Sequence, residues 1–542
     1  MPSQNCANKT SRSSVSTLGW LSRVSFACWL MFAAGSAPQA QLLELPARAS
    51  QLPSLGDGSE LAAASERRLG DRIASSIFRD PDYIDDPVLG DYVQGIWQPL
   101  MAAARARGEL SNELEDRFAW TVMLVRDRSV NAFALPGGYL GVHTGLIAVV
   151  SSADELAAVL AHELSHVTQR HISRLMTQQQ RQMPWVIGAM IIGALAASRS
   201  PTAANAAIVG GQAVAVQGQL NFSRDMEREA DRVGFGVMVD AGFDANGVGG
   251  MFEKLQQASR LNDNGSFPYL RSHPLTTQRI AEARVRLQTA VPGAPNTILN
   301  NAHLHTMMAA RAQVLGNPGV DGLRRLLEDG QRAMPAPNAS RVLTPALAGV
   351  LYGGAFAASR MREHGVAQAL AARLKTLALT VPEARSAAEL LAIEIDFEAG
   401  RIAQAAAASR FDIATSRAQL LVQARALLAA GRAAEVSDKL QTWVVMHPKD
   451  ALAWQLLADA WGRQNQLSRA VRAEAESRFA QLDYPAALDR LRAAQELLRS
   501  GQGGTGQNMH IEASIIDTRT REMAALIREQ VLEDKVDRKL QP

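Results

Sequence analysis

Hydrophobic and polar positions follow distinct periods along the first part of the chain. Between residues 60 and 107 apolar residues recur at helical spacing, with a turn-rich interruption at 79–82. Residues 118–125 are apolar, aromatic and β-branched, which predicts a strand. Two short apolar runs flank a Pro-Gly-Gly turn within residues 131–142, so we expect a β-hairpin there.

Further helical patterns follow this hairpin. Residues 154–174 form a strong amphipathic pattern, which predicts a helix with Ser151 or Ser152 as its N-cap. Residues 184–197 are apolar and small, and this stretch is shorter than the roughly 20 residues that a membrane span needs. We therefore expect a buried or lid helix there, with a membrane-dipping segment as the alternative. A second polar helix begins near Ser223.

The second half of the chain repeats itself. The tripeptides Ala-Gly-Arg at 399–401, Ala-Gly-Arg at 430–432 and Trp-Gly-Arg at 461–463 are spaced 31 residues apart. Each tripeptide lies between two apolar helical runs, where glycine suits a helix terminus. Helix pairs at such a period stack into an α-solenoid. The spacing around Trp454 and Trp461 resembles the tetratricopeptide repeat.

These patterns predict a mostly α-helical protein with a small β-sheet or hairpin in its first domain, followed by an α-solenoid. Residues 501–509 are rich in glycine and predict a flexible break before a last helix at about 517–535. The expected organisation is a signal peptide at 1–40, a loose linker at 41–59, a compact domain at 60–295, a tetratricopeptide-like domain at 300–500, and the break with the C-terminal helix at 501–542.

The N-terminal segment has the features of a secretory signal. A basic, Ser-rich start precedes the apolar run 24–34, and small residues follow at 35–40, where a signal peptidase could cut. We therefore expect export to a bacterial periplasm, with an uncleaved signal anchor as the alternative.

Charge and cysteine content narrow the possible functions. The formal net charge of +3 falls close to zero without Lys9, Arg12 and Arg23 of the expected signal, so no basic stripe remains to bind nucleic acid. The only cysteines, Cys6 and Cys28, also lie in that segment. The exported chain would therefore lack disulfides, and metal ligation is left to His, Asp and Glu.

The predicted helix 154–174 contains the chemistry-bearing motif His162-Glu163-Leu164-Ser165-His166. Residues i and i+4 share one face of a helix, so the two imidazoles can hold one Zn²⁺ at about 2.0–2.1 Å each. Glu163 adjoins the first of these ligands. Its carboxylate can reach a water molecule at the metal and act as a general base.

A third ligand has to come from elsewhere in the chain. A metzincin would need glycine and histidine at the positions of Gln169 and Ile172, so that class is excluded. Glu227 and Asp231 lie one helical turn apart, so Glu227 is expected to complete the site and Asp231 to orient a ligand imidazole. Glu229 points away from the face of Asp231 and is expected to be solvated.

The remaining histidines are assigned by position. His273 precedes Pro274, which favours an extended backbone that could present the imidazole to the cleft. It could cap the free metal position in a resting state or donate a hydrogen bond to a developing oxyanion; a loop histidine without catalytic function is the alternative. His171 is expected to give structural support, and His143 is expected to be structural. The other histidines, His303, His305, His364, His447 and His510, lie outside the first domain's core.

Taken in order, these motifs resemble the zinc metallopeptidase family of HtpX and the CAAX prenyl protease. The resemblance rests on residues 131–138, on His162 to His166 with Arg170-His171, and on the segment from Ser223 to Asp231. It implies a gluzincin-type peptidase domain, one zinc ion held by residues matching His162, His166 and Glu227, and a catalytic Glu163. The chain lacks the clear spanning helices of the integral-membrane members, which argues against a prenyl-protein substrate.

The signal peptide and repeats resemble one periplasmic branch of that family. That branch implies a zinc-dependent endopeptidase that cleaves unfolded or misassembled proteins during outer-membrane β-barrel assembly, and whose repeats act as a chaperone or contact the assembly machinery. The alternative is mainly a scaffold that binds assembly partners, with proteolysis secondary. We also expect the hairpin strand 138–142 to offer an edge on which an extended substrate could pair.

Overall fold

The computed structural model describes residues 62–178, 223–260, 267–289, 301–334, 342–411, 414–502 and 509–539. The expected signal peptide, the linker and the apolar stretch 184–197 lie outside these ranges, as does most of the glycine-rich break. Among the described residues, no helix combines the length and the apolar character needed to cross a membrane.

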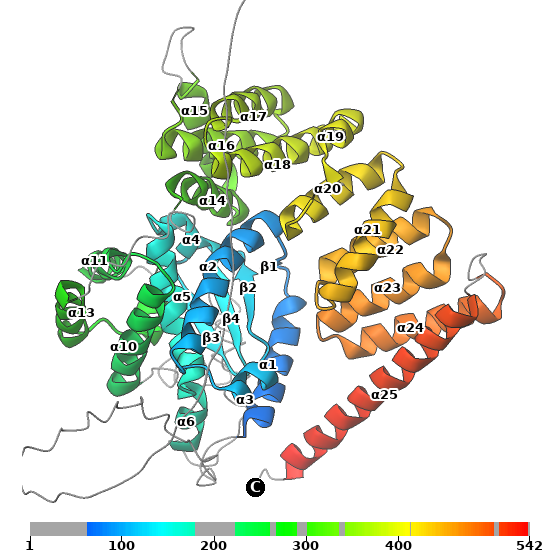
Figure 1. The fold of residues 1–542 in the computed structure, drawn as a ribbon, viewed down its shortest axis with the longest axis horizontal. Coiled ribbons are helices and arrows are strands. Elements are labelled where there is room, and N and C mark those ends of the chain that lie inside the picture. Colours follow the sequence, from blue (N-terminus) through cyan, green and yellow to red (C-terminus); the bar gives the residue numbers. More distant parts are fainter. Residues whose placement is uncertain are drawn as a thin grey trace, which may run out of the picture. The chain divides into compact units, whose positions relative to one another are not determined.

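The first part of the chain contains a small sheet surrounded by helices (Figure 1). Its elements are α1 (Ala63–Phe78), β1 (Tyr83–Ile84), α2 (Pro87–Ala106), α3 (Asn112–Arg117), β2 (Thr121–Val125), β3 (Ala132–Leu135), β4 (Tyr139–His143), α4 (Thr144–Val149), α5 (Ala153–Thr168), α6 (His171–Gln178), α10 (Arg224–Asp240), α11 (Asn246–Arg260), α12 (Tyr269–Ser272) and α13 (Thr277–Thr289).

Helices alone make up the rest of the described chain, so the mostly α-helical fold with one small sheet is confirmed. They are α14 (Ala302–Leu315), α15 (Gly319–Arg332), α16 (Pro345–Arg360), α17 (His364–Ala378), α18 (Pro382–Glu398), α19 (Ile402–Ala408), α20 (Arg417–Ala429), α21 (Ala433–Met446), α22 (Ala451–Arg463), α23 (Leu467–Ala480), α24 (Tyr484–Arg499) and α25 (Met509–Lys539). From α15 onward consecutive helices pack against each other, and α14 packs against α16. The last helix, α25, is longer than its sequence pattern predicted.

The sheet has the strand order β1-β2-β4-β3. β3 and β4 form the expected antiparallel hairpin, and Gly137 and Gly138 adopt positive φ angles of 74° and 83° at its turn. However, β2 pairs in parallel with the other side of β4. The prediction that the strand 138–142 is an edge was therefore wrong: β4 is central and wholly buried, and β3 is the strand of the hairpin that lies at an edge.

The predicted helix 154–174 is divided into α5 and α6. Ser152 caps α5 by accepting a hydrogen bond from the Glu155 N–H at 3.2 Å. The helix ends because Arg170 takes a left-handed conformation with φ 54°, and its guanidinium lies 3.0 Å from the buried carboxylate of Glu66 on α1. Periodicity alone did not reveal this break, because the pattern of apolar residues continues across it.

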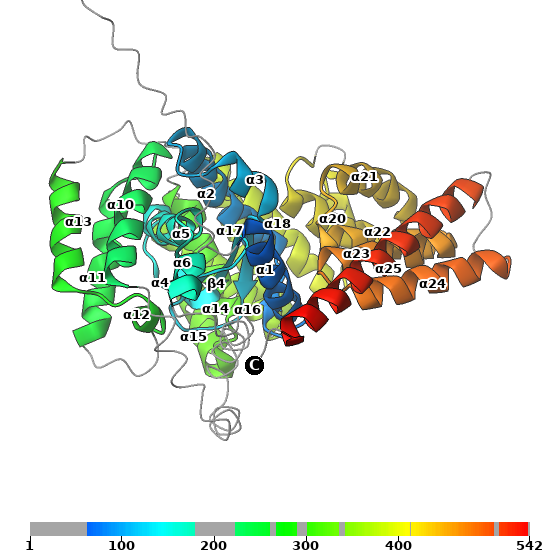
Figure 2. The ribbon, with the colours of Figure 1, turned by 90° about the horizontal axis from the view of Figure 1, so that it is seen from below.

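The helices around α5 position the site. α10 and α11 pack against α5, and α13 packs against both of them (Figures 1 and 2). Gly234 of α10 lies so close to α5 that a Cβ atom there would meet the Ala161 carbonyl at 3.0 Å. This close approach lets the side chains of α10 reach the face of α5 that carries His162 and His166.

One hydrophobic core extends from α1 to α20, across the predicted boundary near residue 300. A buried ion-pair centre lies within it: the Arg311 guanidinium on α14 is only 1% exposed and donates hydrogen bonds of 2.7–2.9 Å to Asp86, Glu394 and the Tyr352 hydroxyl. Asp86 also caps α2 by accepting from the Leu89 N–H. The contacts of Arg311 thus join α2 of the first part to α14, α16 and α18.

We predict that Arg311→Ala lowers the free energy of unfolding by about 3–5 kcal/mol, because it leaves two largely buried carboxylates without their partner. Chemical denaturation followed by circular dichroism measures this loss. The exposed ion pair of Arg332 with Asp329 supplies the control, since Arg332→Ala should cost at most about 1 kcal/mol. Equal effects of the two substitutions would contradict a structural role for the buried centre.

Candidate active site

The motif residues lie on the buried face of α5. His162 is 6% exposed, whereas Glu163 and His166 are fully buried. The Nε2 atoms of His162 and His166 are 3.0 Å apart, as expected for imidazoles one helical turn apart on the same face. Two ring nitrogens that face each other at this distance repel each other unless a proton or a cation lies between them.

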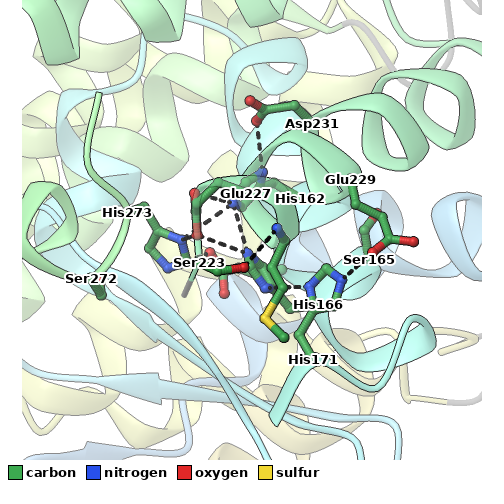
Figure 3. Close-up of polar contacts among 12 residues, drawn as sticks. His162, Ser165, His166, His171, Ser223, Glu227, Glu229, Asp231, Ser272 and His273 are labelled. Atoms are coloured by element: carbon green, nitrogen blue, oxygen red, sulfur yellow. Dashed lines mark hydrogen bonds and ion pairs between the residues drawn. The ribbon is translucent and has the colours of Figure 1, made fainter. Parts of the chain in front are cut away.

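Glu227 of α10 joins the two imidazoles, as its spacing to the motif predicted. Its carboxylate oxygens lie 3.5 Å from the Nε2 atoms of His162 and His166 (Figure 3). His273 belongs to the same cluster, since one potential ligand atom from each of His162, His166, Glu227 and His273 lies within 4.8 Å of the others. Three or four nitrogen and oxygen donors around one point fit a tetrahedral Zn²⁺ site.

The protonation of this cluster favours a cation. Burial alone would raise the pKa of Glu227, but the neighbouring His273 and His162 hold it far below its usual range, so the carboxylate is ionised. Burial also lowers the pKa of His166, which keeps this imidazole neutral. The pKa of His162 is lowered by burial, yet Asp231 and Glu227 outweigh that effect and raise it to about 9. A metal ion at the site would have to displace this proton.

Asp231, which was expected to orient one of the ligand imidazoles, contacts the first histidine. The distance from its Oδ1 to His162 Nδ1 is 3.0 Å, so it can hold the imidazole with Nε2 directed at the cluster. Arg279 of α13 was missed by the sequence reasoning. It donates hydrogen bonds of 2.6 and 2.9 Å to Asp231 and lies 2.8 Å from Glu227 Oε2. Only its burial, which the sequence does not show, distinguishes it from surface arginines.

His273 lies inside the cluster rather than at its rim. Its Nδ1 atom is 3.0 Å from Glu227 Oε1 and 3.3 Å from His162 Nε2, and its Nε2 atom is 3.4 Å from Glu163 Oε1. The ring of Tyr269 stacks on it with a centroid distance of 4.5 Å. The short helix α12 and the Arg271–Pro274 turn thus place this imidazole directly against the potential ligands.

Glu163 is the one carboxylate of the cluster without strong partners. Neither of its oxygens makes a well-formed hydrogen bond with the described residues, and its polar neighbours are His273 and the backbone of Ala134 in β3. Burial raises the pKa of Glu163. A buried carboxylate without strong partners beside a donor cluster is suited to accept a proton from a water molecule.

The second histidine is contacted by His171, for which structural support was expected, and through it by Glu229, whose part was not anticipated. His171 Nδ1 lies 2.9 Å from His166 Nδ1, and His171 Nε2 lies 3.1 Å from Glu229 Oε2 (Figure 3). Glu229 also accepts a hydrogen bond of 2.8 Å from Arg174. Glu229 was expected to be solvated; its side chain is instead only 29% exposed, and it pairs with His171 and Arg174 of α6.

His143, which was expected to be structural, and His305, which was expected outside the first domain's core, have partners away from the cluster. His143 Nδ1 contacts the Ser129 hydroxyl at 3.0 Å, and the two ring nitrogens of His305 contact the Tyr92 hydroxyl at 2.6 Å and the Val150 carbonyl at 2.9 Å. These side chains tie loops and helices together, and none of them belongs to the cluster around Glu227.

The clustered side chains lie in a part of the chain that is similar to known proteins. Residues 92–287, which contain the four clustered side chains, match the model of peptidase family M48. The putative β-barrel assembly-enhancing protease of Vibrio cholerae is 38% identical over 244 residues, which cover 45% of this chain and 48% of that protein. The β-barrel assembly-enhancing protease of Escherichia coli is 29% identical over 434 residues, 79% of this chain and 83% of that protein.

A more distant relative is the mitochondrial metalloendopeptidase OMA1 of Arabidopsis thaliana. It is 30% identical over 247 residues, which cover 44% of this chain and 45% of that protein. The chain thus spans about half the length of the Vibrio cholerae and Arabidopsis thaliana relatives. The family match confirms the kind of metallopeptidase that the motifs indicated. Residues 92–287 are thus similar to peptidase family M48.

Proposed function

We propose that this protein is a periplasmic zinc endopeptidase that cleaves unfolded or misassembled polypeptides during outer-membrane β-barrel assembly. One observation carries the catalytic part of the proposal: His162, His166 and Glu227 converge on one point, and the buried carboxylate of Glu163 lies beside them. The biological part is supported by the similarity to the β-barrel assembly-enhancing proteases of Vibrio cholerae and Escherichia coli. The expected signal at residues 1–40 supports export.

The side chains divide the chemistry among them. When bound by His162, His166 and Glu227, zinc supplies a Lewis acid that makes water more acidic and polarises a carbonyl group. Glu163 accepts a proton from the attacking water molecule and then donates it to the leaving amine. Asp231 keeps Nε2 of His162 directed at the site, and Arg279 holds both Asp231 and Glu227 in place.

The edge strand β3 can recognise an extended substrate backbone. The His143 N–H donates to the Asn131 carbonyl, so in this antiparallel pair the backbone groups of Phe133 and Leu135 also face β4. The backbone groups of Ala132 and Ala134 consequently face away from the sheet, and Ala134 adjoins Glu163. A polypeptide paired along β3 would bring its peptide bonds next to the general base, which favours unfolded chains as substrates.

We further propose that His273 caps the site in a resting state. Its ring lies within 3.0–3.4 Å of Glu227, His162 and Glu163, the region that water and the scissile carbonyl have to enter. The loop that carries it would have to withdraw before substrate binds. Restraint of this kind suits a peptidase that works among folding proteins.

The helices from α14 to α25 support a second function, in which the protein holds polypeptides or assembly partners without cutting them. Consecutive helices stacked in this way offer long surfaces for partners. Proteolysis would then be secondary. Separating the two functions requires a variant that binds but does not cleave.

We predict that Glu163→Gln lowers kcat on an unfolded protein by about 10²–10⁴-fold, because the general base is lost. Zinc content and thermal midpoint should stay close to those of the unmodified protein. The matched control is Glu113→Gln on the exposed surface of α3, which should leave kcat unchanged. If Glu163→Gln still restores outer-membrane assembly in a strain that lacks the protein, the binding function dominates; unchanged kcat would refute the assignment of the base.

Pairing along β3 can be tested on the substrate. In a fluorogenic peptide, N-methylation of a backbone amide that pairs with Ala132 or Ala134 should lower kcat/KM by about 2- to 10-fold, the loss of one hydrogen bond. Methylation of an amide far from the scissile bond serves as the control. A series in which every methylated peptide is cleaved like the parent would show that β3 does not bind the backbone.

The proposed cap predicts that His273→Ala raises kcat/KM for a small peptide, because the site no longer has to be uncovered. Steady-state kinetics on the zinc-loaded protein measures the change, and Ser272→Ala in the same turn provides the control. A fall in kcat of about 10²–10³-fold would instead indicate that His273 stabilises the oxyanion.

A further inference from the structure

We propose that His171 and Glu229 are positioning residues for the proposed zinc ligand His166. The three side chains form a chain in which His166 Nδ1 lies 2.9 Å from His171 Nδ1 and His171 Nε2 lies 3.1 Å from Glu229 Oε2 (Figure 3). Arg174 completes it by donating to Glu229 at 2.8 Å. This inference rests on the proposed metal site and adds residues that neither the motif nor Asp231 includes.

The position of one proton explains how His171 and Glu229 can orient His166. A hydrogen bond between two Nδ1 atoms needs a single proton, carried by His166 or by His171. Glu229 accepts from His171 Nε2, so a neutral His171 carries its proton there and has its Nδ1 lone pair free. His166 then carries its own proton on Nδ1, and its Nε2 atom presents a lone pair to the cluster, which is the tautomer that a metal requires.

The local fold is arranged to make this contact. His171 would lie off the metal face of α5 if that helix continued, because five residues correspond to about 140° beyond a full turn. The left-handed Arg170, held by Glu66, ends α5 and allows α6 to begin at His171. His171 thereby turns under His166 and is fully buried.

The two imidazoles therefore take their orientation from one helix. Asp231 contacts Nδ1 of His162, and Glu229 acts on His166 through His171. Both carboxylates belong to α10, which also supplies Glu227. Unlike Asp231, Glu229 is partly exposed, as is Arg174, so the outer end of this chain of contacts reaches the surface.

Zinc affinity of the purified protein, measured by competition with a chromogenic chelator, tests the inference directly. His171→Leu should weaken zinc binding by about 10- to 100-fold, the usual effect of removing such a partner. His171→Gln should restore most of the affinity, because its amide can accept from His166 and donate to Glu229. Glu229→Gln should lie between the two, and Asp225→Asn on the exposed start of α10 is the charge control.

The cobalt-loaded protein supplies a second readout, since the visible absorption of Co²⁺ reports ligand geometry. We expect the spectrum of His171→Leu to change and that of His171→Gln to resemble the unmodified protein. Thermal midpoints of the metal-free variants separate a loss of ligation from a loss of fold. If the unmodified protein binds no zinc, the proposed function fails; if it binds zinc and His171→Leu binds equally well with the same cobalt spectrum, only the positioning inference is overturned.

Discussion

The burial of three carboxylates in one small volume is the constraint on which the site depends. Glu163, Glu227 and Asp231 are each removed from water, and uncompensated charges of one sign are costly in a protein interior. Two of these charges have positive or polar partners: Arg279 pairs with Asp231 and Glu227, and His162 contacts both. Glu163 lacks a partner of comparable strength among the described residues, and burial raises its pKa. A divalent cation held by His162, His166 and Glu227 would take the place of the proton that His162 otherwise carries.

Local sequence patterns predicted the parts of the site that lie on a single helix. His162, Glu163 and His166 share α5, and Glu227 and Asp231 share a face of α10, so helical periodicity was enough to relate the members of each set. Helical periodicity could not predict residues that reach the cluster from a different helix or turn. Arg279 and His273 reach the cluster from α13 and from the turn before it, and no spacing in the sequence relates them to α5.

The errors of the sequence reasoning have the same physical origin. The hairpin of β3 and β4 was predicted from its turn, but the parallel pairing of β2 with β4 joins segments that the turn does not connect. Glu229 was assigned to solvent because it points away from the face of Asp231; the left-handed Arg170 instead ends α5, and His171 at the start of α6 contacts Glu229. Glu66, about a hundred residues earlier, stabilises the break between α5 and α6. The spacing of apolar residues around Arg170 therefore cannot reveal that break.

A single helix supplying Glu227, Glu229 and Asp231 has a mechanical consequence. A sideways displacement of α10 by a fraction of an ångström would change the anionic ligand and the orientation of both imidazoles together, so partial loss of coordination is disfavoured. The close contact at Gly234 makes a displacement toward α5 difficult. Movement away from α5 is limited by the packing of α11 and α13. Any binding event that loosens those two helices would therefore disable the centre as a unit rather than weaken it by degrees.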